Sequence, residues 1–206
     1  MSSEASQPVT GAGGSGPVRG ASALQPGPTW SFRTRTFHFS GRPLIMGILN
    51  VTPDSFSDGG AHGDADRAVA HGRAMLEQGA DIIDVGGEST RPNAAEVSAE
   101  QELERVIPVI RRLRADSAAA ISIDTAKAAV ARAALEAGAD IINDVSALTR
   151  DPGMAGVARE SGAGVVLMHM RGTPRTMQSD PRDGDCVREV RDYLVSRVDR
   201  LAAEGI

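Results

Sequence analysis

The sequence contains a single cysteine, Cys186, among its 206 residues. One cysteine excludes a disulfide framework and a Cys/His metal centre, and it fits a reducing compartment, so we expect a cytoplasmic protein. The position of Cys186 in a helical pattern favours a structural role over that of a nucleophile. The sequence also lacks a P-loop, a GxGxxG stretch and a serine triad. It therefore gives no support to the enzyme classes that depend on those motifs.

Excess positive charge and long apolar runs are absent as well. The formal net charge is -5 and no dense basic stripe occurs, so nucleic acid is not an expected partner. No apolar run approaches the length of a membrane span, and no apolar segment follows a basic start, so we expect neither a membrane anchor nor a secretory signal. Residues 1–29 are rich in Gly, Ser, Pro and Ala, and we expect a disordered leader there.

The sequence does contain a repeated helix-to-strand pattern. The segments EQGADII (77–83), EAGADII (136–142) and ESGAGVV (160–166) each place a glycine between a helical stretch and a β-branched run. A glycine at this point suits the left-handed cap that ends many helices, and the apolar run that follows suits a buried strand. The pattern predicts consecutive strand–helix units within one domain.

Strands and helices are expected to alternate along the chain. Strands are predicted at 44–49, 81–85, 120–124, 140–145 and 165–169. Helices are predicted from Asp64 to Gly79, from a capping box of Ser98 and Gln101 onward, and at about 126–137, 153–161 and 186–204. Pro108 predicts a kink or a late start in the second helix. The alternation predicts a parallel sheet.

Polar residues at the strand ends separate the two architectures that fit this alternation. The five strands end near Asn50, Asp84 with 88–91, Asp124, Asn143 and His169. In a (β/α)8 barrel all carboxyl ends of strands meet at one rim, whereas in an open doubly wound sheet only those near the switch point meet. Polar residues at all five ends favour an α/β fold of the TIM (β/α)8 type.

The first candidate site residues follow the first two strands. Asn50 fits either a turn cap before Pro53 or an uncharged oxygen ligand for Mg2+. The stretch GGESTRPN (86–93) combines glycines with two hydroxyl groups and a guanidinium, which are suited to phosphate or pyrophosphate. Its alternative is an exposed turn with a solvated arginine. Anion binding is favoured because five such residues occur together.

Asp124 and Asn143 each follow an apolar run and are expected to be partly buried. Each could bond a neighbouring backbone amide or Lys127, or the two could together match the donors and acceptors along the edge of a heterocycle. His169 fits a hydrogen-bonded rim residue better than a general base. Together these residues predict a barrel rim that holds a planar heterocycle and a pyrophosphate.

Five stretches resemble dihydropteroate synthase, the folate-pathway enzyme. They are IMGILNVTPDSFSDGG (45–60), GADIIDVGGESTRPNA (79–94), ISIDT (121–125), IINDVS (141–146) and LMHMRGTPRTMQ (167–178). The resemblance covers the chain from about residue 42 onward and implies a pterin-binding domain at 42–206. That family joins 7,8-dihydropterin-6-ylmethyl diphosphate to 4-aminobenzoate on a (β/α)8 barrel and releases pyrophosphate and 7,8-dihydropteroate. It is a cytoplasmic, typically homodimeric transferase and a sulfonamide target.

The resemblance also implies roles for individual residues. They are Asn50 as a ligand of Mg2+, Thr90 and Arg91 at the pyrophosphate, Asp124 and Asn143 at the pterin, and Phe56, Asp58 and Pro92 in two mobile loops that form the aminobenzoate pocket. Breaking the C–O bond first leaves a cation conjugated to the dihydropterin. Mg2+ and Arg91 would then stabilise the leaving group, and Asp58 and Asp124 the cation. Closed loops would keep water from capturing the cation.

The chain departs from the family in length. Only 163 residues run from Leu44 to Ile206, enough for five βα units, whereas a complete barrel typically takes about 250 residues. The family's later motifs, Asp-Pro-Gly-x-Gly-Phe, Ser-Arg-Lys and Arg-x-His, are missing. We expect the strands at 44–49 and 165–168 to be uncovered edges, and the chain alone to be poorly stable with little or no synthase activity. The alternatives are an inactive pterin-binding remnant and a methyltetrahydrofolate-dependent methyltransferase of the same fold.

Overall fold

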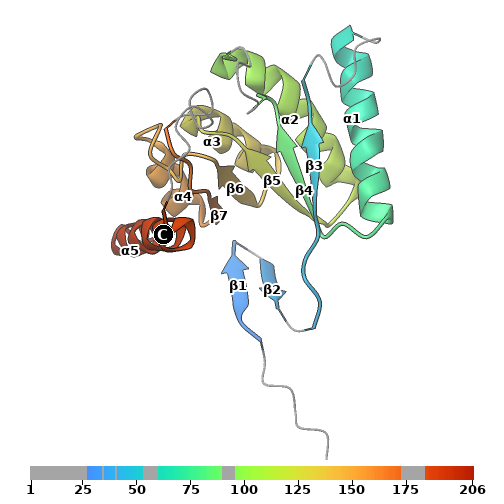
Figure 1. Cartoon of the computed structure of the whole chain (residues 1–206). Helices are drawn as coiled ribbons and strands as arrows, with labels where there is room; N and C mark the ends of the chain where they lie inside the picture. The colour runs from blue at the N-terminus through green and yellow to red at the C-terminus, as the bar shows by residue number, and fades with distance from the viewer. Residues whose placement is uncertain (1–26, 34, 40, 53–59, 90–95, 173–183) are drawn as a thin grey trace, which may run out of the picture.

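The computed structural model describes residues 27–33, 35–39, 41–52, 60–89, 96–172 and 184–206. A two-stranded antiparallel hairpin precedes a five-stranded parallel sheet (Figure 1). The strands are β1 (Thr29–Phe32) and β2 (Arg35–His38) in the hairpin, and β3 (Met46–Asn50), β4 (Ile82–Gly86), β5 (Ala120–Asp124), β6 (Ile141–Asp144) and β7 (Gly164–Leu167) in the sheet. The helices are α1 (Gly60–Glu77), α2 (Ala99–Asp116), α3 (Ala128–Ala137), α4 (Met154–Ser161) and α5 (Cys186–Ala203).

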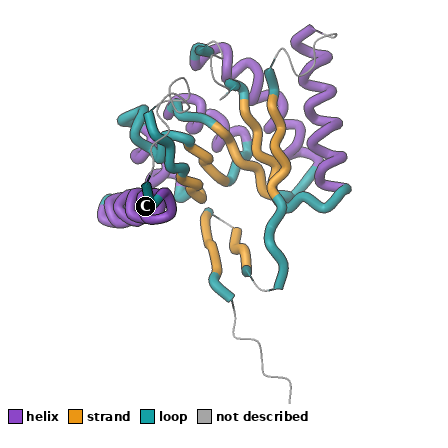
Figure 2. Tube along the Cα trace, viewed as in Figure 1, coloured by secondary structure: helices purple, strands orange, loops and turns teal. Residues whose placement is uncertain are grey.

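The strand order of the sheet decides between the two predicted architectures. It is β3-β4-β5-β6-β7, so each strand pairs with the next one along the chain and the order never reverses. A doubly wound sheet needs such a reversal, whereas a barrel adds each strand on the same side. The helices correspondingly curve around one face of the sheet, as Figure 2 shows. The arrangement is that of five consecutive βα units of a (β/α)8-type barrel, which confirms the predicted fold class.

The two faces of the sheet have different cores. On the helix side, alternate strand residues such as Leu49, Val85 and Ile123 are fully buried against the helices. On the inner side, Ile82, Ala120 and Ile141 pack with Phe32 from the hairpin. Because side chains in a strand alternate between faces, the intervening residues Asn50, Asp84 and their neighbours all lie on the inner side. The helix-side core thus holds the sheet while the inner side is left for polar groups.

The hairpin β1–β2 closes the amino-terminal end of the inner face. The rings of Trp30 and Phe32 lie 4.6 Å apart, and Phe37 lies 5.7 Å from Phe32. A Cβ at Gly164 would come within 2.8 Å of Trp30, so only glycine allows β7 to approach this aromatic group. The sequence did not predict the hairpin, and β1 begins at Thr29, the last residue assigned to the leader. Residues 1–26 lie outside the described part of the chain, so the predicted disordered leader stays a prediction.

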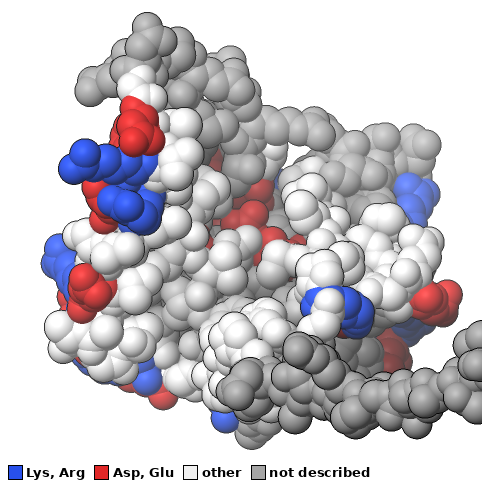
Figure 3. Space-filling model, turned by 60° about the horizontal axis from the view of Figure 1, so that its bottom comes forward, with Lys and Arg blue, Asp and Glu red and all other residues white. Residues whose placement is uncertain are grey.

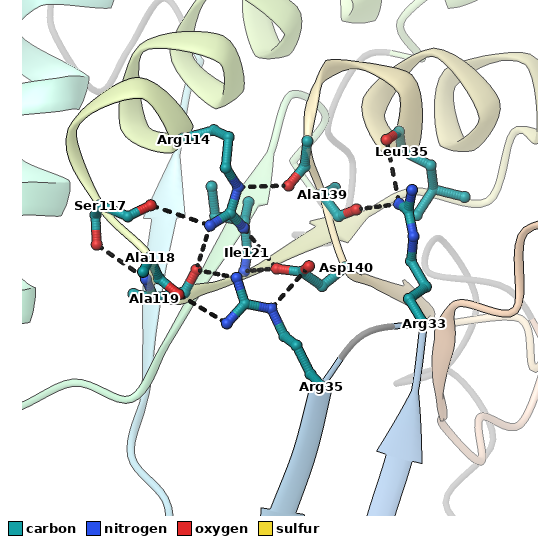
Figure 4. Close-up of polar contacts among 11 residues, drawn as sticks. Arg33, Arg35, Arg114, Ser117, Ala118, Ala119, Ile121, Leu135, Ala139 and Asp140 are labelled. Carbon is teal, nitrogen blue, oxygen red and sulfur yellow. Dashed lines mark hydrogen bonds and ion pairs between the residues drawn. The ribbon is translucent and has the colours of Figure 1, made fainter.

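Three charged side chains, which we call the Asp140 cluster (Arg35, Arg114 and Asp140), fasten the hairpin to the sheet (Figure 4). Arg35 Nε lies 2.8 Å from Asp140 Oδ1, and Arg114 Nη2 lies 2.6 Å from Asp140 Oδ2. Asp140 Oδ2 also accepts a hydrogen bond from the backbone N–H of Ile121 at 3.0 Å. Arg33, at the hairpin turn, donates to the carbonyl of Ala139 at 2.7 Å. Hairpin, α2 and β6 are thereby joined at one point.

The helix boundaries agree with the sequence in most cases. The left-handed glycines predicted after the first and third helices are Gly79 (φ 104°) and Gly138 (φ 117°). Helix α2 begins at Ala99 and continues through Pro108, so a late start is wrong. Helix α1 begins at Gly60, four residues before the predicted cap Asp64, which is therefore inside the helix. Aspartate is compatible with the early part of a helix as well as with its cap, so residue type alone could not locate this start.

Ser98 and Gln101 form the predicted capping box at the start of α2. Ser98 Oγ accepts from the backbone N–H of Gln101 at 3.2 Å, and Gln101 Oε1 accepts from the backbone N–H of Ser98 at 3.2 Å. We expect Ser98→Ala to lower the free energy of unfolding by about 1 kcal/mol, because the backbone N–H of Gln101 loses its acceptor at the start of the helix. Urea unfolding would measure this, with Gln101→Ala as a partner that removes half of the box. A Ser98→Ala curve that superimposes on the wild-type curve would contradict it.

Strands β3 and β7 are the terminal strands of the sheet, and among the described residues each pairs with one strand only, as predicted. In β3, Ile48 is 65% exposed, whereas β7 lies against strand β1 of the hairpin. Helix α5 places its apolar residues on one face, but Val187 and Val198 are exposed and only Leu201 is buried.

None of the described helices is both long enough and apolar enough to cross a membrane.

Candidate functional site

Three of the predicted site residues lie in one row across the sheet. The parallel register pairs Asn50 with Gly86, Gly86 with Asp124, and Asp124 with Asn143, so β3, β4, β5 and β6 each contribute one residue at the same level. Residues paired in this way point to the same face of a sheet. The row lies at the carboxyl ends of the strands, where a barrel places its functional groups. The structure therefore brings Asn50, Asp124 and Asn143 together.

Gly86 opens a gap in the middle of this row. A Cβ built at Gly86 would lie 3.5 Å from Asp124 Oδ2 and 3.7 Å from Asn50 Oδ1. The two oxygens therefore approach the same point from β5 and β3, and no side chain separates them. An amide oxygen and a carboxylate oxygen are both hard donors of the kind that Mg2+ binds. The donor set fits that ion, with Asn50 as the uncharged member.

A second polar layer lies directly beneath the row. Asp84 and Ser122 are paired in the register, two residues before Gly86 and Asp124, and are 4% and 0% exposed. Asp84 Oδ2 accepts a hydrogen bond from Asn143 Nδ2 at 2.9 Å. The sequence offered Lys127 as one partner for Asn143. In the structure the side-chain amide of Asn143 is bonded to the carboxylate of Asp84 instead. Asp84 was visible in the sequence only as one polar residue at a strand end.

Asp124 has an unusual protonation equilibrium for an aspartate. Burial and, to a smaller extent, the negative charges of Asp84, Glu102, Asp144 and Glu88 together raise its pKa from the ordinary 3.8 to about 7. Burial also raises the pKa of Asp84, against the effect of hydrogen bonds to its carboxylate. Figure 3 shows acidic side chains inside a hollow of the molecule, whereas most of the visible arginines and lysines lie toward the outer edges of the view. The site is thus a region of negative potential.

The strand end that leads into STRP is fastened by charged groups. Lys127 Nζ lies 2.5 Å from Glu88 Oε2 and 2.6 Å from Glu102 Oε2, and Glu102 is fully buried in α2. Glu88 Oε1 accepts from the backbone N–H of Val97 at 3.3 Å, which joins two residues that flank the motif. Arg105 donates to the carbonyl of Gly87 at 2.7 Å. Lys127 thus anchors Glu88 and Glu102, and it is not the partner of Asp124 that the sequence left open.

The remaining predicted residues fall in two groups. Phe56, Asp58, Thr90, Arg91 and Pro92 lie outside the described residues, and their placement stays a prediction. His169 is described. Its Nε2 lies 3.6 Å from Glu189 Oε1, and its ring lies 5.0 Å from Tyr193 in an edge-on arrangement. Both partners belong to α5, and the sequence could not identify this acidic neighbour because it is 20 residues away. His169 is a rim residue packed against a helix.

Among the described residues, no group of three or more His, Cys, Asp and Glu side chains is placed to hold a metal ion. A divalent cation at the row would therefore have few protein ligands in this part of the chain. Mg2+ is often held in this way when phosphate oxygens supply other ligands.

Comparison with known proteins gives consistent results. The family described as "Pterin binding enzyme" matches residues 46–206. Dihydropteroate synthase of Escherichia coli K12 is 51% identical over 164 residues, which are 80% of this chain and 58% of that protein. A crystal structure of Yersinia pestis dihydropteroate synthase with a sulfonamide drug complex superimposes with a TM-score of 0.79 at 46% identity, over 87% of this chain and 64% of that one.

Dihydropteroate synthase of Xanthomonas albilineans with 4-aminobenzoic acid superimposes with a TM-score of 0.78 at 48% identity, over 87% of this chain and 63% of that one. The chain spans less than two thirds of the length of each of these relatives. The matched region includes the whole parallel sheet and the row of Asn50, Asp124 and Asn143. The chain therefore belongs to the family of pterin-binding enzymes.

Proposed function

We propose that this chain is the pterin- and pyrophosphate-binding part of a dihydropteroate synthase, which joins 7,8-dihydropterin-6-ylmethyl diphosphate to 4-aminobenzoate in folate biosynthesis. The observation that carries the proposal is the row of Asn50, Asp124 and Asn143 in a chain of the pterin-binding family. A carboxylate beside an amide matches the alternating donors and acceptors along the edge of a pterin ring. Asp124 and Asn143 would hold that edge.

The pyrophosphate would lie toward β3 and β4. Asn50 would hold Mg2+ through Oδ1, and the ion when bound would neutralise charge on the leaving pyrophosphate. Thr90 and Arg91 would contact the pyrophosphate directly. Support for this assignment comes from the anchored strand end, where Lys127 and Arg105 fix Glu88 and Gly87 just before these residues.

The acidic interior suits the charge that develops in the reaction. Cleavage of the C–O bond leaves positive charge on the methylene carbon and the dihydropterin ring. The carboxyl groups of Asp124 and Asp84 lie on the same side of the sheet, and their ionised forms would stabilise such a cation. The amine of 4-aminobenzoate is already a nucleophile, so no strong base is required. Asp58 and Arg91 are the proposed catalytic groups, and Phe56 and Pro92 would complete the aminobenzoate pocket from their loops.

The proposed setting is a cytoplasmic enzyme that acts as a homodimer, with a leader that ends before Thr29, the first residue of β1, and with 42–206 as the pterin-binding domain. The terminal strands β3 and β7 each pair with one described strand only, which supports the expectation that the 206-residue chain alone is poorly stable and turns over little substrate. Ligand binding is therefore a more sensitive test of this chain than turnover.

Isothermal titration of the 206-residue chain with the pterin diphosphate, with and without Mg2+, tests the proposal. We expect Mg2+ to increase the affinity for the pterin diphosphate about tenfold in the wild-type chain. In Asn50→Ala this increase should be lost. The affinity of Asn50→Ala for a pterin that lacks the diphosphate should equal that of the wild-type chain. Glu96→Gln, an exposed change at the Arg150 ion pair, is the matched control. Binding without turnover would identify a pterin-binding remnant. Preference for methyltetrahydrofolate over the pterin diphosphate would contradict the synthase assignment and favour the methyltransferase.

A further inference from the structure

The hydrogen bond between Asp84 and Asn143 crosses the sheet from one layer to the next. Asp84 belongs to β4 and to the layer beneath the site, whereas Asn143 belongs to β6 and to the site row itself. The two residues are 59 positions apart in sequence and are separated in the sheet by β5, yet Nδ2 and Oδ2 are 2.9 Å apart. The Asp84 side chain therefore reaches toward the site row and contacts a residue proposed to bind substrate.

This contact fixes the direction of the Asn143 amide. An ionised carboxylate can only accept hydrogen bonds, so the nitrogen of the amide must face Asp84. The carbonyl oxygen and the second N–H of Asn143 are then left for a ligand. Without Asp84, a turn of about 180° about the last side-chain bond would exchange the oxygen and the nitrogen, and the amide would present either end.

The surroundings show that a carboxylate is not needed here for packing. The same layer contains Ile48 and Ile141, and the layer below it contains Met46, Ile82 and Ala120, which are apolar. Asp84 is only 4% exposed, and burying a carboxylate is costly, so an apolar residue of the same volume would be expected to stabilise the fold at least as well. A buried acid that is bonded to a site residue therefore indicates a role in the site.

We propose that Asp84 is a positioning residue of the pterin site, which acts through Asn143 by orienting its amide oxygen toward the N–H donors of the heterocycle. The inference rests on the proposed function, because it takes Asn143 to be a reader of the pterin edge. In this role Asp84 favours ligands that present a hydrogen-bond donor to Asn143 Oδ1 over ligands that present an acceptor there. Asp84 itself does not contact the ligand.

The test measures two ligands on the wild-type chain and its variants by isothermal titration: the pterin diphosphate with Mg2+, and inorganic pyrophosphate with Mg2+. We expect Asp84→Ala to weaken binding of the pterin diphosphate about tenfold, the effect of about one hydrogen bond, and to leave binding of pyrophosphate unchanged. Asp84→Leu, which has nearly the shape of aspartate but no acceptor, is the second variant if Asp84→Ala does not fold. Asp84→Asn keeps an acceptor oxygen and should restore the affinity to within about threefold.

Two comparisons distinguish orientation from general loss of structure. Glu160→Gln alters an exposed ion pair with Arg132 that is remote from Asp84, and it should leave both affinities unchanged. In an Asn143→Ala background, Asp84→Ala should cause no further loss of pterin affinity, because its target is already absent. Additive losses in the double variant, or an equal loss of pyrophosphate binding, would overturn the inference. Failure of the wild-type chain to bind the pterin diphosphate would overturn the proposed function and this inference with it, whereas normal binding by Asp84→Ala and Asp84→Leu would overturn the inference alone.

Discussion

Replacing Asp140 by alanine is expected to lower the free energy of unfolding by about 3 kcal/mol or more. Asp140 is 8% exposed and forms ion pairs with both Arg35 and Arg114, whose side chains are each 25% exposed. Removing one partner of a largely buried charge group leaves the others unpaired, which is far more costly than losing an exposed ion pair. The backbone N–H of Ile121 loses its acceptor at the same time.

Urea unfolding followed by tryptophan fluorescence would measure this effect. Trp30 is the single tryptophan of the chain and lies in the hairpin that the Asp140 cluster fastens, so its emission reports directly on hairpin detachment. Glu160→Gln is the control, because the Arg132–Glu160 pair is about half exposed on both sides and is expected to contribute less than about 1 kcal/mol. A loss below about 1 kcal/mol for Asp140→Ala would show that the cluster does not hold the hairpin.

The sheet and the site row could be predicted because both follow from local sequence. Each glycine-centred helix end, such as Gly138, is followed within three residues by a strand, and each strand either ends in a polar residue or has one within the next two positions. In a parallel sheet, strands of similar length that begin at one edge also end at a common level. The alignment of Asn50, Asp124 and Asn143 could therefore be predicted once the barrel architecture was identified.

The contacts that could not be predicted join residues far apart in sequence. Arg33 meets Ala139 across 106 positions, and Asp84 meets Asn143 across 59. The residues of β1 and β2 show alternation too short to indicate a hairpin, and their stability comes from the aromatic group and the arginines. Lys127 lies three residues after Asp124 in the sequence, but it is the residue that precedes the first turn of α3, and its amine contacts Glu88 and Glu102. Local spacing could not reveal this choice of partner.

Replacing Asp124 by asparagine is expected to stabilise the fold at pH 8 and to abolish most pterin binding. The pKa of Asp124 is about 7 in the folded chain, because of burial and four nearby carboxylates, against 3.8 for a free side chain. A folded-state pKa above the unfolded value means that the folded chain binds the proton more tightly. The contribution to stability is therefore complete below about pH 4 and is lost as the pH rises through 7.

Between pH 5.5 and pH 8 this group should lower the free energy of unfolding of the wild-type chain by about 2 kcal/mol, since one pKa unit corresponds to about 1.4 kcal/mol. Asp81 and Glu100 do not contribute in this window, because hydrogen bonding lowers their pKa values below the ordinary 3.8 and 4.5. Asp84, whose pKa burial also raises, leaves a smaller slope of the same sign in Asp124→Asn. Urea unfolding of both chains at pH 5.5, 7 and 8 would measure these slopes, and an equal slope in the two chains would contradict the assignment. If the variant is more stable at pH 8 yet no longer binds the pterin diphosphate, Asp124 is an acid that the fold retains at the expense of stability because the ligand requires it.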